Sequence, residues 1–300
     1  MGILGTRQSA SAPAVATSSL STVRSRLRRD IAAWALVIVF LPVSIAAALP
    51  FIWMYLSSFK TPTEIHSLTI TWFPSEFYLE GYEYALEHFA LVRGYANSVF
   101  VSGIGVLASV VTSAMAGFLF AKKQFWGKNL LFIFILSTLM VPFFAIFIPS
   151  YVVYAVFLNI KDTYMALILP HVFTAFGILI TRQFLHSVPN ELIDSATVDG
   201  AGDWRVFWYI ILPLSRSVLA AIAILQFLGS FNEFLWPLVM VDNQNLYTLP
   251  LVMRKVTAAQ GPHPSRMLAA SVLGLTPIVI FFLIFQRHIV RGIALTGVKG

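Results

Sequence analysis

The sequence contains no cysteine, which excludes disulfide bonds, a thiolate nucleophile, a cysteine zinc site and an iron–sulfur cluster. Charge is also scarce, because only 11% of the 300 residues are charged, against roughly 25% in a soluble domain. Hydrophobic residues make up 58%, and 26 of them are phenylalanine. A soluble surface cannot accommodate so much apolar side chain, whereas lipid can. The composition therefore predicts an all-α protein that crosses a membrane several times.

Catalytic motifs are missing as well. The sequence has no Gly-x-x-x-x-Gly-Lys-[Ser/Thr] loop for ATP, and neither His-Glu-x-x-His nor Gly-x-Ser-x-Gly occurs. Ser57 and Lys60 match the Ser-x-x-Lys pair of penicillin-recognising enzymes, but the companion motifs are absent. The six histidines are scattered, and none lies four residues from another on a helix. We therefore expect no catalytic residues and no metal site, so that the chain is not an enzyme.

Long runs without charge predict six membrane-spanning helices. A span needs about 20 residues, and the run from 129 to 160 is long enough to contain more than a simple span. Pro142 and Pro149 lie within this run and predict a kink or a re-entrant extension. The expected spans are residues 33–56, 95–120, 130–151, 163–182, 217–240 and 267–286.

The basic residues predict the orientation. If the N-terminus lies inside, most of the 20 Lys and Arg residues fall in cytoplasmic segments, and the first outside loop is acidic. Both termini are therefore expected in the cytoplasm, and the net charge of +7 reflects this bias rather than binding to nucleic acid. Residues 1–30 are expected to form a disordered cytoplasmic tail, since residues 1–22 are rich in Ser, Ala and Thr. Residues 31–300 would form the membrane domain.

A stripe of small residues runs along the second expected span. One small residue recurs at every fourth position, which allows another helix to approach closely. Helices in lipid associate through such packing, so the stripe predicts a tight helix bundle and is compatible with a partner subunit. Its members are Gly105, Ser109, Ser113, Gly117 and Ala121.

The first outside loop predicts an amphipathic helix on the outer membrane surface. Such a helix could be a lid on the bundle or a docking surface for an extracytoplasmic partner. Apolar Leu79, Tyr82, Leu86 and Phe89 fall on one face, and Glu80, Glu83 and Glu87 fall on another.

The segment 183–216 is the only long cytoplasmic loop between expected spans. Pro189 can open a short helix, Asp199-Gly200-Ala201-Gly202 predicts a turn, and an apolar stripe follows before Pro213. Two short helices should thus meet at a glycine turn, where small residues let another chain approach, although an ordinary interfacial helix would show the same pattern. The stripe consists of Trp204, Phe207, Trp208 and Ile211.

This segment resembles the EAA loop of permease subunits in bacterial ABC importers, whose pattern is roughly E-A-A-x-x-D-G-A followed by L-P. Asp194 and Ser195 stand where that family usually has Glu and Ala, and Ser217 stands where a Pro often follows. Other stretches resemble the sugar-importer, maltose-type second permease: Ser58–Pro62, Phe231–Pro237, Thr248–Leu251 and Gly297–Gly300. The loop residues that carry the resemblance are Glu191, Asp194, Ser195, Ala196, Asp199, Gly200 and Ala201, followed by Leu212-Pro213-Leu214.

The resemblance implies a six-helix permease in the bacterial cytoplasmic membrane that imports a sugar or polyol by alternating access. It implies pairing with a second, homologous permease and with an ABC ATPase dimer that binds the EAA loop. It also implies delivery of solute by an extracytoplasmic substrate-binding protein. ATP and magnesium would bind the partner ATPase, and no cofactor would bind this chain.

Glu233 is a carboxylate near the outer end of the fifth expected span, beside Asn232. Ionisable groups in spans are costly and are by default functional candidates. We consider two interpretations: these residues line the translocation path, or they tie helices together. Two rival functions also remain, namely an ABC importer for a solute other than sugar and an ion-coupled secondary carrier. The carrier would usually show more spans and an internal repeat.

Overall fold

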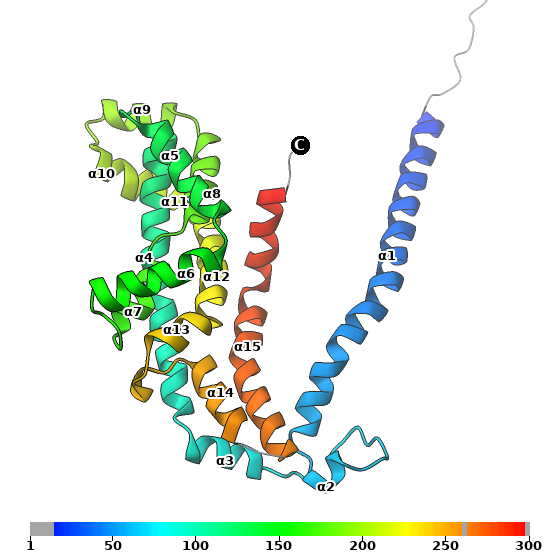
Figure 1. Cartoon of the computed structure of the whole chain (residues 1–300). Coiled ribbons are helices and arrows are strands. Elements are labelled where there is room, and N and C mark those ends of the chain that lie inside the picture. Colours follow the sequence, from blue (N-terminus) through cyan, green and yellow to red (C-terminus); the bar gives the residue numbers. More distant parts are fainter. Residues whose placement is uncertain (1–14, 260–262, 298–300) are drawn as a thin grey trace, which may run out of the picture. The chain divides into compact units, whose positions relative to one another are not determined.

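The computed structural model describes the backbone of residues 15–259 and 263–297, and the side chains of residues 34–259 and 263–286. The chain divides into two compact units, residues 1–56 and 57–300, and the described residues include no strand. Helix α1 (Val15–Ser57) makes up the described part of the first unit (Figure 1). Residues 15–30, expected to be disordered, are thus helical, because no glycine or proline interrupts residues 15–41. The remainder of the expected tail, residues 1–14, lies outside the described part.

The second unit is built from many shorter helices. Brief 3-10 or π turns at 138–140, 153–157, 169–171, 207–211 and 244–246 connect or extend several of them. In chain order the helices are α2 (Pro62–Ile65), α3 (Glu80–His88), α4 (Leu91–Lys122), α5 (Lys128–Ser137), α6 (Phe143–Val152), α7 (Tyr164–Ile168), α8 (Ala175–His186), α9 (Glu191–Val198), α10 (Asp203–Val206), α11 (Leu212–Leu214), α12 (Arg216–Phe231), α13 (Leu235–Met240), α14 (Leu249–Ala259) and α15 (Pro264–Gly297).

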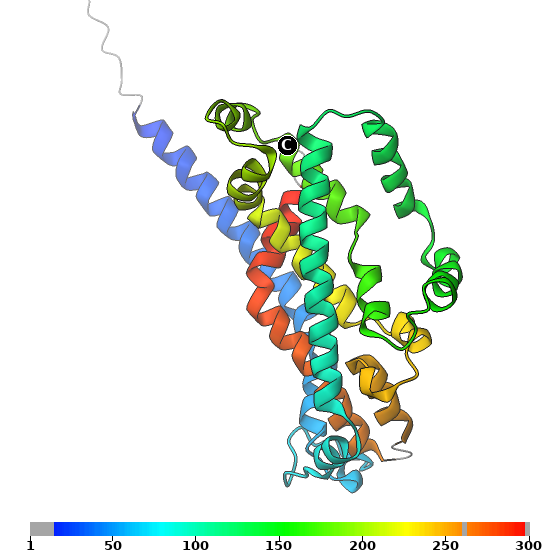
Figure 2. The same ribbon diagram turned by 90° about the vertical axis from the view of Figure 1, so that its left-hand side faces the viewer.

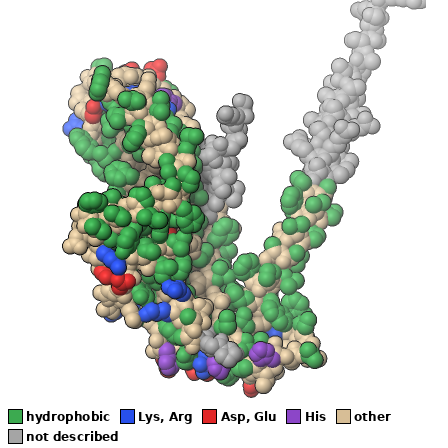
Figure 3. All heavy atoms as spheres, in the orientation of Figure 1, with side chains coloured by type: hydrophobic (Ala, Val, Ile, Leu, Met, Phe, Trp, Pro, Cys, Tyr) green, Lys and Arg blue, Asp and Glu red, His purple; other side chains and the backbone are tan. Residues whose placement is uncertain are grey.

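Four segments among the described residues are long and apolar enough to cross a membrane as single spans, and two bent helix pairs could raise the number to six. The four are residues 34–57, 91–122, 164–186 and 264–286. Hydrophobic side chains cover much of the visible face of the second unit, and charged side chains lie at the end that carries α9 and α10 and again toward the opposite end (Figure 3). This distribution fits a helical bundle with an apolar girdle that faces lipid.

Helix α4 is the centre of the second unit and packs against α8 and α12, while α15 packs against α3, α12 and α14 (Figure 2). The predicted stripe of small residues forms the α4–α8 contact. A Cβ atom added at Gly117 would lie 2.6 Å from Cβ of Thr181, which is closer than carbon atoms can approach. Ser109 and Ser113 on the same stripe are fully buried. The expectation of close helix packing is confirmed.

The third expected span, residues 130–151, is broken. The segment 128–140 and the segment 143–157 meet at an angle of 104°. The bend falls at Pro142, which precedes α6, because a proline in a continuous helix would lack its N–H donor and clash with the preceding turn. The predicted kink or re-entrant extension is therefore present.

The fourth and fifth expected spans are interrupted as well. A 3-10 turn at Leu169–His171 and a short extended stretch separate α7 from α8. The expected span 217–240 stops at Phe231 and resumes as α13 at Leu235, so it is not one continuous helix. Proline fits the first turn of a helix without the loss of a backbone hydrogen bond, whereas in the interior it removes one. Pro237, in the first turn of α13, is thus compatible with a new helix start.

The end of the second unit opposite α9 and α10 holds the acidic loop helix, α3 (Figure 1). Its buried face consists of Gly81 and Ala85, which pack against α15, whereas Leu79 and Leu86 are exposed. The expected apolar face is thus partly wrong, because a close helix contact selects small side chains. Glu80 forms an ion pair with Arg266 at the start of α15.

Candidate functional site

Residues 191–206 form two short helices joined by a glycine turn, as the segment 183–216 predicted. Helix α9 ends in a Schellman motif: the N–H of Ala201 donates to the Ala196 carbonyl at 2.9 Å, and the N–H of Gly200 donates to the Thr197 carbonyl at 3.0 Å. Gly200 has φ of +81°, a left-handed conformation that glycine adopts without strain. The glycine in the Asp-Gly-Ala turn is therefore required by the geometry of the helix end.

Two lysines at the end of α4 anchor the segment. The ammonium group of Lys122 donates to the Val188 carbonyl at 2.5 Å and to Oδ1 of Asn190 at 2.7 Å, just before α9. Lys123 forms an ion pair with Asp203, the first residue of α10. One helix end of the bundle thus holds the beginnings of both α9 and α10.

An apolar cluster below the turn joins the segment to the bundle. Ile193 of α9 and Phe207 after α10 are buried in it, next to side chains from three long helices. Because close-packed interiors transmit displacement, a force on α9 and α10 would act on α4, α8 and α12 together. The buried members are Ala114, Phe118, Leu185, Ile193, Val206, Phe207, Ile211, Val218, Leu219 and Ile222.

The seven residues expected to couple this segment to an ATPase lie on α9 and its turn. The structure brings them together on one exposed surface, and the two alanines turn partly toward the apolar cluster. Exposed are Glu191, Asp194, Ser195, Asp199 and Gly200, and half-buried are Ala196 and Ala201.

The same surface carries apolar side chains that the sequence analysis did not assign to it. Val198 is 87% exposed beside the turn, and Trp204 is 64% exposed. Trp204 and Trp208 were expected to share a stripe with Phe207 and Ile211, but only the latter two are buried. The π turn at residues 207–211 changes the helical period and so separates the stripe. The sequence does carry a signal for the exposure of Val198, because at helical spacing this residue lies off the face that Ile193 and Ala196 share.

Asn232 and Glu233, expected to line a translocation path, lie in the break between α12 and α13 rather than inside a helix. Oε1 of Glu233 accepts the N–H of Trp236 at 3.3 Å, at the start of α13. Nδ2 of Asn232 donates to the Leu228 carbonyl at 2.8 Å, and this side chain is exposed. Glu233 therefore bonds to the first turn of α13. Such a bond agrees with the structural interpretation, which was the alternative to a path-lining role.

Half-buried polar groups gather at the break between α7 and α8, which the sequence analysis also missed. Nε2 of Gln226 lies 3.3 Å from Nδ1 of His171, and Oγ1 of Thr112 donates to the Val172 carbonyl at 2.6 Å. A Cβ at Gly105 would lie 3.0 Å from Cβ of His171, so this small residue admits the imidazole. Irregular backbone at membrane depth requires such internal partners.

Comparison with known proteins agrees with this architecture. The permease of the arabinooligosaccharide transport system of Halalkalibacterium halodurans is 35% identical over 278 residues, covering 92% of this chain and 99% of that protein. The lactose transport system permease of Rhizobium radiobacter is 31% identical over 276 residues, covering 91% of this chain and 97% of that protein. A crystal structure of a bacterial ABC transporter that imports the acidic polysaccharide alginate matches with a TM-score of 0.74 and 19% identity, covering 88% of this chain and 97% of that chain.

The alginate transporter shares the fold of this chain. In addition, the family model described as binding-protein-dependent transport system inner membrane component matches residues 109–295, which is more than half of the sequence. That range includes the C-terminal part of α4 and all of α9 and α10. The chain therefore belongs to the family of inner membrane components of binding-protein-dependent transport systems, and its role is that of an ABC importer permease rather than an enzyme.

Proposed function

We propose that the chain is a permease subunit of an importer for oligosaccharides, driven by a separate ATPase. The proposal for the solute is supported by the relatives, whose names specify arabinooligosaccharides and lactose. The proposal for the mechanism is carried by one observation: an exposed helix–turn–helix that is packed on three long helices of the bundle.

The coupling surface consists of Glu191, Asp194, Ser195, Ala196, Asp199, Gly200 and Ala201, together with the exposed Val198. An ATPase subunit would receive α9 in a groove and move it when ATP and magnesium close the ATPase dimer. Lys122 and Lys123 would keep the segment in register with α4 during this movement. The apolar cluster would then carry the displacement into α4, α8 and α12.

The remaining subunits follow from the family. A second, homologous permease would complete the path, and an extracytoplasmic binding protein would deliver the sugar. The C-terminal end of α15 points toward the end of the second unit that carries α9 (Figure 1). This direction supports a cytoplasmic C-terminus, provided that α9 and α10 face the ATPase in the bacterial cytoplasm.

The proposal is tested by reconstituting the complete complex with its ATPase, second permease and binding protein in proteoliposomes. ATP hydrolysis should be stimulated by the binding protein loaded with an arabinooligosaccharide, and labelled sugar should enter only vesicles that receive ATP. Stimulation by glycerol phosphate alone would indicate an importer for a solute other than sugar. Uptake that follows an ion gradient in the absence of ATP would indicate a secondary carrier and would contradict the proposal.

A further inference from the structure

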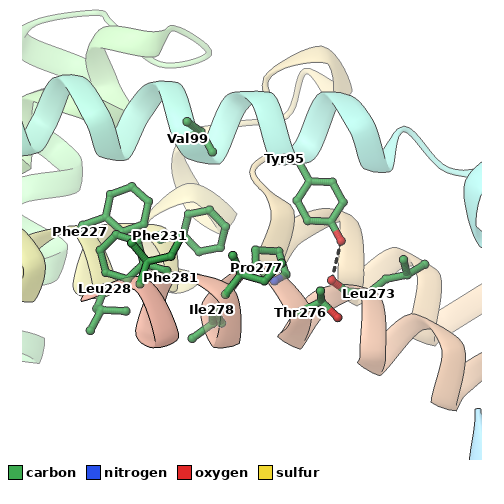
Figure 4. A pocket seen from close by; sticks show the side chains of 12 residues that line it. Tyr95, Val99, Phe227, Leu228, Phe231, Leu273, Thr276, Pro277, Ile278 and Phe281 are labelled. Carbon is green, nitrogen blue, oxygen red and sulfur yellow. Dashed lines mark hydrogen bonds between the residues drawn. The ribbon is translucent and has the colours of Figure 1, made fainter. Parts of the chain in front are cut away.

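Helix α15 contains a proline whose effect on the backbone is repaired by another helix. Pro277 has no N–H, so the carbonyl of Leu273, four residues earlier, lacks its regular helical donor. Tyr95 of α4 donates its hydroxyl to this carbonyl at 2.5 Å (Figure 4). In hydrocarbon no water can serve as the donor, so the tyrosine supplies the hydrogen bond that the proline removes.

The same arrangement occurs a second time, between α13 and α7. Pro170 leaves the carbonyl of Ala166, again four residues earlier, without its helical donor. Nε1 of the buried Trp236 donates to this carbonyl at 2.8 Å. Two aromatic side chains from neighbouring elements thus replace the backbone donors lost at two prolines in membrane-spanning segments.

An apolar pocket lies beside Pro277. An apolar cavity of about 450 Å³ lies between α4, α12 and α15, and Pro277 is one of its lining residues (Figure 4). Beyond the proline, the rings of Phe281 and Phe227 of α12 stack with centroids 4.4 Å apart. A helix bends most readily at a proline, where one backbone hydrogen bond is missing. Tyr95 thus holds α15 to α4 just before Pro277, and the ring stack contacts α12 just after it.

We propose that Tyr95 and Trp236 are positioning residues for transport, each holding a proline-containing span at the carbonyl that the proline leaves without a donor. Tyr95 sets the angle of α15 at Pro277, and Trp236 sets that of the α7–α8 segment at Pro170. The inference rests on the proposed transport function, because a bend in a span matters for activity only if the bundle changes conformation during the cycle.

The test is a double-mutant cycle in the complete complex. Tyr95→Phe removes the hydroxyl, and Pro277→Ala restores an N–H that can donate to Leu273. Tyr95→Phe alone should raise the rate of thermal inactivation in detergent about threefold, the usual effect of one interhelical hydrogen bond. It should also lower the maximal rate of ATP-driven uptake without changing the half-saturating concentration of loaded binding protein. In the Pro277→Ala background, Tyr95→Phe should change neither quantity.

A second tyrosine provides the matched control. Tyr164 donates its hydroxyl to Oδ1 of Asn97 at 2.8 Å, a bond that involves no carbonyl freed by a proline. Tyr164→Phe should therefore have the same effect with and without Pro277→Ala. The parallel cycle of Trp236→Phe with Pro170→Ala should show the coupling seen for Tyr95 and Pro277.

Equal effects of Tyr95→Phe in both backgrounds would overturn the assignment. Faster inactivation with uptake at the wild-type rate would restrict Tyr95 to a structural role and would also overturn it. Failure of the proposed function has a different signature: the unmodified complex would not transport sugar, while the inactivation cycle would still report whether Tyr95 and Pro277 are coupled.

Discussion

The ammonium group of Lys122 lies 2.7 Å from Oδ1 of Asn190, so the last residue of α4 holds the residue that precedes α9. This bond places the proposed coupling segment at the end of the central helix of the bundle. Neighbouring Lys123 pairs with Asp203 at the start of α10. The two contacts explain how a surface segment can be exposed to a partner and still be held firmly by the membrane helices.

Gly200 allows the effect of strain to be separated from that of docking. Gly200→Val introduces a branched side chain at φ of +81°, so substrate-stimulated ATP hydrolysis should fall while the protein still inserts in the membrane. Gly200→Ala should cost about 1–2 kcal/mol through the left-handed conformation. Gly202→Ala is the control, because its φ is −74° and a Cβ there meets no described atom within 4 Å.

Asparagine tolerates the left-handed conformation, so Gly200→Asn keeps the helix end while adding a side chain to the docking surface. Its thermal stability should equal that of the wild type, whereas its stimulated ATPase activity should be reduced. If Gly200→Val and Gly200→Asn complexes assemble and transport like wild type, α9 is not the docking site.

Gly117 tests the close contact of α4 with α8. Gly117→Ala places a methyl group 2.6 Å from Cβ of Thr181 and should destabilise the protein by about 1–3 kcal/mol through overpacking. Gly103→Ala, on the same helix, meets no described atom within 4 Å and should be neutral or stabilising, because alanine favours helix. Thermal unfolding in detergent compares the two variants, and equal midpoints would show that the α4–α8 contact is looser than described.

Glu233 can be tested by comparing two substitutions. Glu233→Gln keeps an oxygen that can accept the Trp236 N–H, whereas Glu233→Ala removes it. If Glu233 also lines the path, as expected from the sequence, Glu233→Gln should assemble with the ATPase and alter uptake rate or sugar preference at equal protein level. Asn232→Ala should have a much smaller effect. A Gln variant that behaves as wild type, together with an unstable Ala variant, would assign Glu233 to the start of α13 and exclude the path role.

The ion pair between Glu80 and Arg266 should make stability depend on pH. The hydrogen bond from the Arg266 guanidinium lowers the pKa of Glu80 below its ordinary value of 4.5. The pair therefore contributes its full stabilisation above the ordinary pKa and loses it as the pH falls through the lowered pKa of the folded protein. Between about pH 6 and about pH 3.5, the thermal midpoint of wild type should fall more than that of Glu80→Gln.

Glu83 supplies the control for this pH dependence, because it lies exposed on the same helix. Glu83→Gln should retain the wild-type pH profile. A Glu80→Gln variant with the same acid sensitivity as wild type would show that the ion pair does not link α3 to α15 in solution.

The orientation inferred from the loop charges can be tested with reporter fusions. An enzyme that is active only outside the cytoplasmic membrane should be silent when fused after Gly300 and active when inserted near Ser75. The reverse pattern would place both termini outside and would refute the proposed contact of α9 with a cytoplasmic ATPase.

Several features of the fold were accessible from sequence because their causes are local. Absence of charge over 20 or more residues predicts spans, and Pro142 predicted the bend in the third one. The Asp-Gly-Ala turn predicted the end of α9, since few residues other than glycine adopt a left-handed conformation there. The stripe that includes Gly117 predicted close packing, since only small residues allow two helix backbones to meet.

The breaks in the fourth and fifth spans and the hydrogen bonds of Tyr95, Trp236 and Glu233 were not accessible in this way. A proline in a span frees a carbonyl, and the donor that replaces its own can come from elsewhere in the chain: the Tyr95 hydroxyl comes from α4, far from Pro277 in sequence. Composition and local pattern alone determined that this protein is a bundle of membrane helices with a compact helix pair at its surface. Only the tertiary structure decided which carbonyls, rings and carboxylates meet, because hydrogen bonds between distant segments depend on how the helices pack.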